Sequence, residues 1–140
     1  MKKITLLFAG LLASSMASAV QLTGTGGTVQ RIAPCDTLLN EDVRINLTTG
    51  VEAGVHCNAV RIAIAACHTG GRQVGRSAQV TTACDQVANP GCTDTVTTST
   101  VTGPAMAVAT TNRGTVISGY PGGACTAATA ETFATGQPNN

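Results

Sequence analysis

The sequence predicts an all-β fold, a small disulfide-stabilised antiparallel sandwich or barrel-like domain that follows a cleaved N-terminal signal peptide. Three observations support this prediction. Apolar and polar residues alternate over several short runs, which is the period of a half-buried strand. Glycine and threonine interrupt these runs about every ten residues, a spacing typical of turns in sandwiches and barrels. Six cysteines, all beyond the leader, offer covalent links between the strands.

The first nineteen residues have the order of a secretory signal peptide. Met1-Lys2-Lys3 is followed by an apolar run over 4–13 and then by the small residues Ala17-Ser18-Ala19. We expect Sec-type export and cleavage before Val20, which places the protein in the periplasm, at the cell surface or outside the cell. An uncleaved anchor or a core helix is the alternative. No later run reaches the ~18 apolar residues of a membrane helix, so we expect no transmembrane segment in the mature chain.

The expected mature chain, residues 20–140, carries little charge. Both lysines leave with the leader, so six arginines face seven acidic residues and the net charge is −1 with neutral histidines. Because no basic patch or run of like charge remains, the sequence argues against nucleic acid as a partner. The mature aromatic residues are Tyr120 and Phe133 alone. A core without large rings needs further stabilisation, and disulfides would contribute roughly 2–4 kcal/mol each.

Six cysteines permit fifteen disulfide pairings, and local spacing supports some of them better than others. Cys84 and Cys92 bracket Asn89-Pro90-Gly91, a strong turn signal, which predicts a Cys84–Cys92 bridge. Cys35 and Cys57 flank a predicted hairpin, so we expect a Cys35–Cys57 bridge. Cys67–Cys125 then completes the set. Free or metal-bound thiols are the alternative to this arrangement.

The first half of the chain contains two predicted hairpins and a central strand. Segments 21–23 and 28–30 flank a glycine-rich turn and are predicted to pair. Residues 43–48 alternate in hydrophobicity, and 51–55 is predicted to return beside them after the Thr49-Gly50 turn. The apolar run 59–66 is predicted to be a central strand covered on both faces, with 73–83 as its partner.

The second half is rich in threonine and ends in small polar residues. Strands are predicted over the threonine-rich segment 93–102 and over 105–110 and 115–118, the last two joined by an Asn112-Arg113-Gly114 turn. We therefore expect one β-rich domain over 20–125. Residues 126–140 are predicted to be a polar tail, of which at least 136–140 is loose, with a short helical turn within 124–134 as the alternative.

Motifs of familiar chemistry are incomplete in this sequence. Cys67-His68 lacks the first cysteine of a haem-attachment motif, and no Cys-x-x-Cys occurs anywhere. Gly75-Arg76-Ser77-Ala78-Gln79 lacks the final glycine of a hydrolase elbow. His56 and His68 each adjoin a cysteine and form a weak alternative site for copper or zinc. We expect no cofactor and no metal, because an extended strand between these histidines would hold them far apart.

Acidic residues and one arginine are the remaining candidates for a catalytic site. Glu41-Asp42 and Glu52 flank a predicted turn, but a glycosidase would surround such acids with aromatic rings that this chain lacks. Arg61 interrupts the apolar central strand, and a buried arginine must have a partner. We therefore expect these residues to serve structure, and we expect no enzymatic activity.

Three functions remain, and the first is the leading hypothesis. It is a non-enzymatic secreted or cell-surface structural protein that assembles with itself as a subunit of a fibre or surface layer. The 22 threonines of the mature chain and its low charge favour strand edges that pair with another copy. The alternative is a periplasmic module that binds or inhibits an envelope protein through a disulfide-rigidified loop, with Asn89, Pro90, Gly91 and Tyr120 as contacts. A small copper or zinc carrier, or a small hydrolase, is third.

Overall fold

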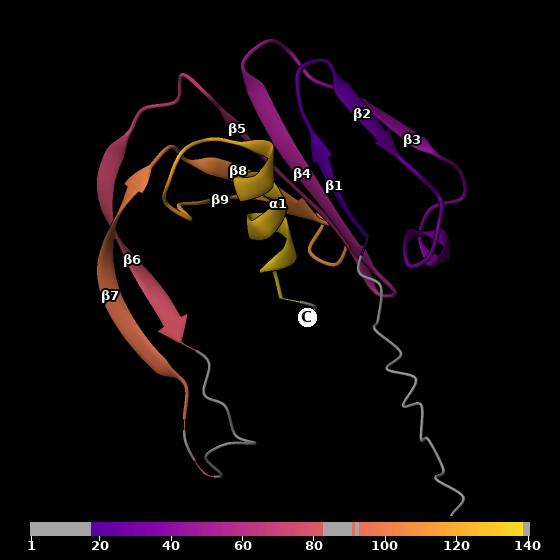
Figure 1. Ribbon diagram of the computed structural model, residues 1–140. Coiled ribbons are helices and arrows are strands. Elements are labelled where there is room, and N and C mark those ends of the chain that lie inside the picture. The colour runs from indigo at the N-terminus through magenta and orange to yellow at the C-terminus, as the bar shows by residue number, and fades with distance from the viewer. Residues whose placement is uncertain (1–17, 83–90, 92, 139–140) are drawn as a thin grey trace, which may run out of the picture.

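A computed structural model describes residues 18–82, 91 and 93–138 of the chain (Figure 1). These ranges contain nine strands, one short 3-10 helix and one α-helix. The predicted all-β, antiparallel class is confirmed. In chain order, the elements are β1 (Ser18–Leu22), β2 (Gly26–Val29), η1 (Cys35–Thr37), β3 (Val43–Asn46), β4 (Val51–Asn58), β5 (Arg61–His68), β6 (Val74–Thr82), β7 (Thr95–Gly103), β8 (Met106–Thr110), β9 (Val116–Gly119) and α1 (Ala127–Thr135).

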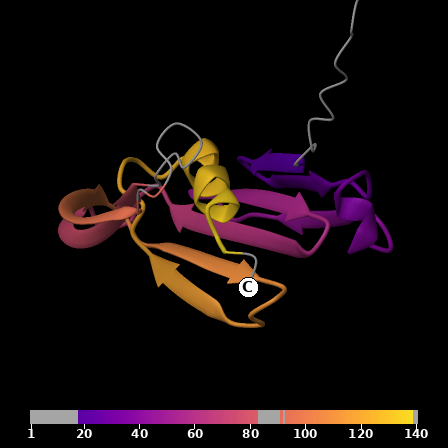
Figure 2. The ribbon, with the colours of Figure 1, turned by 90° about the horizontal axis from the view of Figure 1, so that it is seen from below.

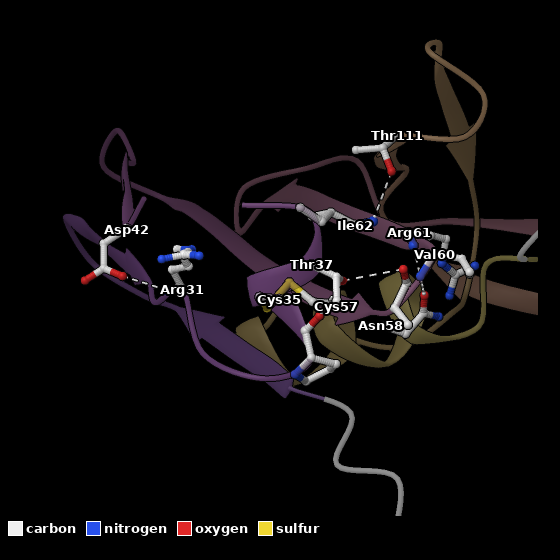
Figure 3. Close-up of a disulfide and its surroundings, with 12 residues drawn as sticks. Arg31, Cys35, Thr37, Asp42, Cys57, Asn58, Val60, Arg61, Ile62 and Thr111 are labelled. Carbon is white, nitrogen blue, oxygen red and sulfur yellow. Dashed lines mark hydrogen bonds between the residues drawn. A yellow bond between two sulfur atoms is a disulfide. The ribbon is translucent and has the colours of Figure 1, made fainter. Parts of the chain in front are cut away.

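A five-stranded antiparallel sheet in the order β1-β4-β5-β8-β9 forms the body of the fold. At its centre, β4 and β5 pair along their whole length, from Val51 opposite His68 to Asn58 opposite Arg61. The Asn58 side chain accepts hydrogen bonds from the N–H groups of Val60 and Arg61, at 3.0 and 2.9 Å, and closes the turn between the strands (Figure 3). The apolar run predicted as a central strand therefore lies at the centre of the sheet.

Three predicted strand pairings are wrong, although strands form in each of these regions. β1 pairs with β4 and β2 with β3, so the predicted hairpin of 21–23 and 28–30 is reduced to a single bridge between Thr23 and Gly26. β3 does not pair with β4, and β6 pairs with β7 instead of β5. A strand has only two edges, and β1 and β5 already occupy those of β4, while β4 and β8 occupy those of β5.

β1 spans the boundary that the sequence predicts for leader cleavage. Ser18 and Ala19 precede the predicted cut and pair with Cys57 and His56. The three residues from Val20 to Leu22 follow the cut and pair with Val55, Gly54 and Ala53. Three of the five paired residues of β1 thus belong to the expected mature chain. Within the described ranges, the structure has no helix long and apolar enough to cross a membrane.

The helix α1 covers one face of the five-stranded sheet (Figure 2). Its N-cap is Thr126, whose hydroxyl accepts the N–H of Thr129 at 3.1 Å. A stripe of small residues faces the sheet, and the Cys67–Cys125 disulfide fixes the start of the helix to β5. We call this side the helix face; its buried residues are Ala63, Ala65, Cys67, Met106, Val108, Cys125, Ala130 and Ala134.

The segment after Cys125 is therefore part of the fold and not the polar tail that the sequence predicts. Ala127, Ala130 and Ala134 recur at helical spacing and are all buried. Because alanine is small, the helix axis approaches the sheet closely, and Gly54 of β4 lies directly beneath the backbone of Glu131. The short helical turn expected within 124–134 was the better alternative, and the helix extends to Thr135.

The opposite face of the sheet is covered only in part, by the β2–β3 hairpin and η1. Leu22 of β1 and Val55 of β4 pack against Val29 of the hairpin, and all three are buried. The Cys35–Cys57 disulfide joins η1 to the end of β4 (Figure 3). The sheet is thus covered by a helix on one face and by a small hairpin on the other, in place of the second large sheet that a sandwich would have.

β6 and β7 form a separate two-stranded arm beside the body (Figure 1). Their register runs from Val74 opposite Gly103 to Thr82 opposite Thr95. Most described side chains of the arm are exposed. Its base is attached to the body in two ways: the Arg76 guanidinium lies 4.4 Å from the centre of the Tyr120 ring, and the Gly123 N–H donates to the carbonyl of Thr102 at 2.8 Å.

Candidate functional site

Two of the three expected disulfides lie within the described residues. Cys35 and Cys57 are bridged with their Cα atoms 5.2 Å apart, and Cys67 and Cys125 with theirs 5.8 Å apart. Both pairings are those expected from the sequence. The Cys84–Cys92 bridge and the contacts Asn89 and Pro90 lie outside the described residues. Gly91 is described, is exposed and has a positive φ of 91°, as a turn glycine does.

The structure places the two histidines far apart. His56 lies opposite Ala63 and is 5 % exposed, whereas His68 lies opposite Val51 at the other end of the β4–β5 ladder. The two histidine rows are five residues apart, or roughly 17 Å at 3.3 Å per residue. His68 is exposed, and its Nδ1 accepts the N–H of Gly70 at 3.0 Å. Among the described residues, no three His, Cys, Asp or Glu side chains gather as metal ligands would.

A buried polar cluster surrounds Ala63 on the helix face. His56 and Thr110 are its neighbours on the two flanking strands, and Arg61 lies two residues before it on β5. Arg61 is 2 % exposed, and its Nη2 donates to the carbonyl of Thr135 at the C-terminal end of α1, at 3.1 Å. A helix C-terminus favours a cation, so this carbonyl is a partner of the kind that a buried arginine requires.

Several polar atoms of this cluster have no hydrogen-bond partner in the described part of the protein. They are Nε and Nη1 of Arg61, Nδ1 of His56 and Oγ1 of Thr110. Burial lowers the pKa of Arg61, and nearby Arg113 lowers it further. Burial also lowers the pKa of His56, an effect that Arg61 strengthens and Glu131 opposes. All four atoms are packed away from solvent, and therefore from a dissolved substrate.

The candidate carboxylates do not converge either. Asp42 precedes β3, in the hairpin that covers one side of the sheet, and accepts the backbone N–H of Arg31 at 2.6 Å (Figure 3). Glu52 pairs with Cys67, whose side chain belongs to the helix face. Because opposite residues of an antiparallel pair share a face, Glu52 points to the side of the sheet away from Asp42. These acids are not placed to act together on one bond.

An apolar surface remains uncovered beyond the β2–β3 hairpin. Ile62, Ile64, Ala109 and Val116 share one side of β5, β8 and β9, and we call this surface the open face. Ile62, Ile64, Ala109 and Val116 line a hollow of about 240 Å³ together with the 111–115 turn. Ile62 and Ile64 also line a smaller hollow of about 110 Å³ under the hairpin. The two hollows therefore share Ile62 and Ile64 in their walls.

β9, at the margin of the open face, is an edge strand with apolar residues exposed on both sides. Val116 is 69 % exposed on the open face, and Ile117 is 39 % exposed on the helix face. The sequence predicts a strand here, but its two apolar residues were not among the predicted functional residues. The available signal was the adjacent Val-Ile pair: neighbouring residues of a strand point to opposite faces, so both are buried only where both faces are covered.

Tyr120, predicted as a partner contact, helps to attach the arm to the body. Its ring is half-buried under Arg76. A hollow of about 390 Å³ separates this part of the body from the arm, lined by Ser77, Ala78, Gln79, Val101, Tyr120, Pro121 and Phe133. The Tyr120 ring is therefore only partly available to another molecule.

Comparison with known proteins identifies no relative: no family model matches the sequence, and no curated protein or solved structure is significantly similar. The residues and their geometry therefore have to support any functional conclusion.

Proposed function

We propose that this chain is an exported, non-enzymatic structural protein that assembles with copies of itself at the cell surface or outside the cell. The observation that carries the proposal is the uncovered apolar surface at the β9 end of the sheet, where Val116 is 69 % exposed beside the hollows that Ile62 and Ile64 line. Contiguous exposed apolar surface is typical of a region that contacts another macromolecule.

The arm gives independent support. β6 and β7 pair mainly with each other, and β7 is uncharged, with exposed threonine and serine side chains on both faces. Long uncharged edges allow further strand pairing because they contain no charge that would repel a second strand.

The distribution of polar groups supports the non-enzymatic part of the proposal. The buried ones around Arg61 are sealed, and the acids Asp42 and Glu52 lie on opposite sides of the sheet.

Export is supported by the leader-like first nineteen residues and by the two disulfides. Cysteines that pair in the folded protein persist as disulfides mainly in an oxidising compartment. The low charge of the chain is compatible with close packing of many copies, since little like-charge repulsion accumulates between them.

The test is the assembly state of the native protein. The secreted or envelope-associated material is purified without reduction, and its mass is measured by light scattering over a wide concentration range. Electron microscopy of the same sample then shows any ordered assembly. We expect concentration-dependent oligomers or larger assemblies of this chain alone. Monomers at every concentration would overturn the proposal, and a stoichiometric complex with one other envelope protein would favour the binding module instead.

A further inference from the structure

We propose that β9 pairs antiparallel with β9 of a second copy, so that two five-stranded sheets join into one continuous ten-stranded sheet. This inference rests on the proposed function and names the edge and the register through which two copies meet. Figure 2 shows β8 and β9 (orange) along one margin of the sheet, below α1 (yellow). The strand order places β9 at the end of the sheet, with β8 on one side only.

The exposed residues of β9 indicate which kind of structure can bind beside it. Val116 is exposed on the open face and Ile117 on the helix face. A partner that adds one more strand contacts both residues at once, because a strand presents side chains to both faces of the sheet. A globular surface resting on one face would leave the other residue exposed. The neighbour is therefore a strand.

Charge favours a second copy as that neighbour. No residue from Gly114 to Ala130 carries a charged side chain. Two β9 strands thus come together without placing like charges side by side, which is the usual obstacle to edge pairing. The required occupant is a short uncharged strand with an apolar residue on each face, and β9 itself meets that requirement. Among the described strands, β7 is also uncharged, but its single strongly exposed apolar residue is Val96, on one face.

The two faces of the sheet restrict the register of this pairing. In an antiparallel pair, residues directly opposite one another point to the same face. Registers centred on any one residue of β9 keep the faces matched, and the proposed one is centred on Ile117 because it brings two apolar Ile117 side chains opposite one another and places Val116 opposite Ser118. In both contacts, the two opposite residues point to the same face of the sheet. A shift by one residue would place Val116 opposite Ile117 of the second copy, on the wrong face, and is excluded.

The resulting dimer has a two-fold axis perpendicular to the sheet. The axis leaves both α1 helices on one side and both open faces on the other, so each copy uses the same surface, as in an isologous dimer. Gly119, next to the centre of the pairing, has no side chain, and the ring of Phe133 lies against it. The Phe133 ring thus covers the helix face beside Ile117, and the Ile117 pair continues this apolar layer across the two-fold axis.

The experiment uses the full exported chain with its disulfides intact and replaces Ile117 by a charge. I117K and I117E each place two like charges opposite one another in this register. We expect each variant alone to lose at least tenfold in self-association, measured by analytical ultracentrifugation. An equimolar mixture of the two should recover association to within tenfold of the unmodified chain, because the introduced ammonium then faces the introduced carboxylate. The matched control is V60K, since Val60 is 61 % exposed but lies in the turn between β4 and β5.

The outcomes separate this inference from the proposed function. Far-UV circular dichroism and the absence of free thiols confirm that each variant is folded. If the unmodified chain associates and I117K associates equally well, β9 is not the interface, while self-assembly stands. If both variants dissociate but the mixture does not recover, the Ile117-centred register is wrong. A strictly monomeric unmodified chain overturns both this inference and the proposed function.

Discussion

The two edge strands of the five-stranded sheet differ in how they are protected. β1 buries Leu22 to 1 % exposure and half-buries Val20, whereas β9 leaves Val116 69 % and Ile117 39 % exposed. β1 is protected because the next segment of the chain, β2, turns back across it and forms the hairpin with β3 that covers that side. After β9 the chain crosses to the helix face instead, so the residues that follow β9 do not cover Val116 on the open face. Protection of an edge here depends on the path of the chain after it.

The covered half of the sheet is also the cross-linked half. Cys35–Cys57 joins η1 to β4 beside β1, and Cys67–Cys125 joins β5 to the start of α1. Neither bridge reaches β8 or β9. The two described bridges therefore link segments around β1, β4 and β5 and leave β9 without a covalent link to another strand.

The largest effects are expected from removing the bridges of the covered half. Replacing both cysteines of either bridge by alanine should lower the free energy of unfolding by about 2–5 kcal/mol. Cys67–Cys125 spans 58 residues and Cys35–Cys57 spans 22, so loop entropy predicts about 0.9 kcal/mol more for the longer bridge. Equilibrium denaturant unfolding of the two double variants measures the difference. A larger loss for the shorter bridge would show that local packing outweighs loop entropy.

Truncation of one apolar residue on each edge tests the comparison directly. Leu22→Ala should lower the free energy of unfolding by roughly 2–5 kcal/mol, because it leaves a cavity under the hairpin. Val116→Ala should change it by less than about 0.5 kcal/mol, because the side chain is already exposed. Both are measured by denaturant unfolding at a concentration where the chain is monomeric. A loss above about 1 kcal/mol for Val116→Ala would show that β9 is covered within its own chain.

A smaller effect is expected at Arg61, in the polar cluster of the helix face. Arg61→Met should raise the free energy of unfolding by about 1 kcal/mol, because it removes a buried charge with two unpartnered donors and nearly preserves the volume. Arg61→Ala is the control, since it removes the charge but leaves a cavity and should destabilise. Thermal or denaturant unfolding measures both. Destabilisation by Arg61→Met would show that the bond to Thr135 outweighs the cost of burying the charge.

The smallest effect is a pH dependence that originates at His56. Its pKa is lowered in the folded protein, chiefly by burial, so below about pH 6.5 the unfolded chain binds a proton more readily than the folded one. The stabilising contribution of neutral His56 is complete above that pH and falls as the pH drops toward the folded pKa. Denaturant unfolding between about pH 8 and pH 5 should show this loss. His56→Gln should reduce this loss, and an unchanged slope in that variant would contradict the assignment.

Most strand positions could be predicted from the sequence, and most strand partners could not. The alternation at Val43 and Ile45, the apolar run of β5 and the glycine turns all correspond to observed elements. The errors concern which strands meet: β3 with β2, and β8 rather than β6 beside β5. Partner choice depends on competition for two edges per strand, which local periodicity does not record. The helix was underestimated because alanine and threonine give a weak amphipathic pattern.

The features of the candidate site likewise divide into those that the sequence predicts and those that it does not. The burial of Arg61 follows from its place in an apolar run, and both described disulfides were expected, although Cys35–Cys57 was inferred from a hairpin that does not form and Cys67–Cys125 by elimination. The exposure of Val116 and Ile117 does not follow from the sequence, because it depends on where the chain goes after β9. By itself, the sequence determined which segments become strands and how little charge the surface carries, since these are local or compositional properties. Only the tertiary structure decided which edge is covered, because covering depends on the path that the chain takes across the sheet after each edge strand.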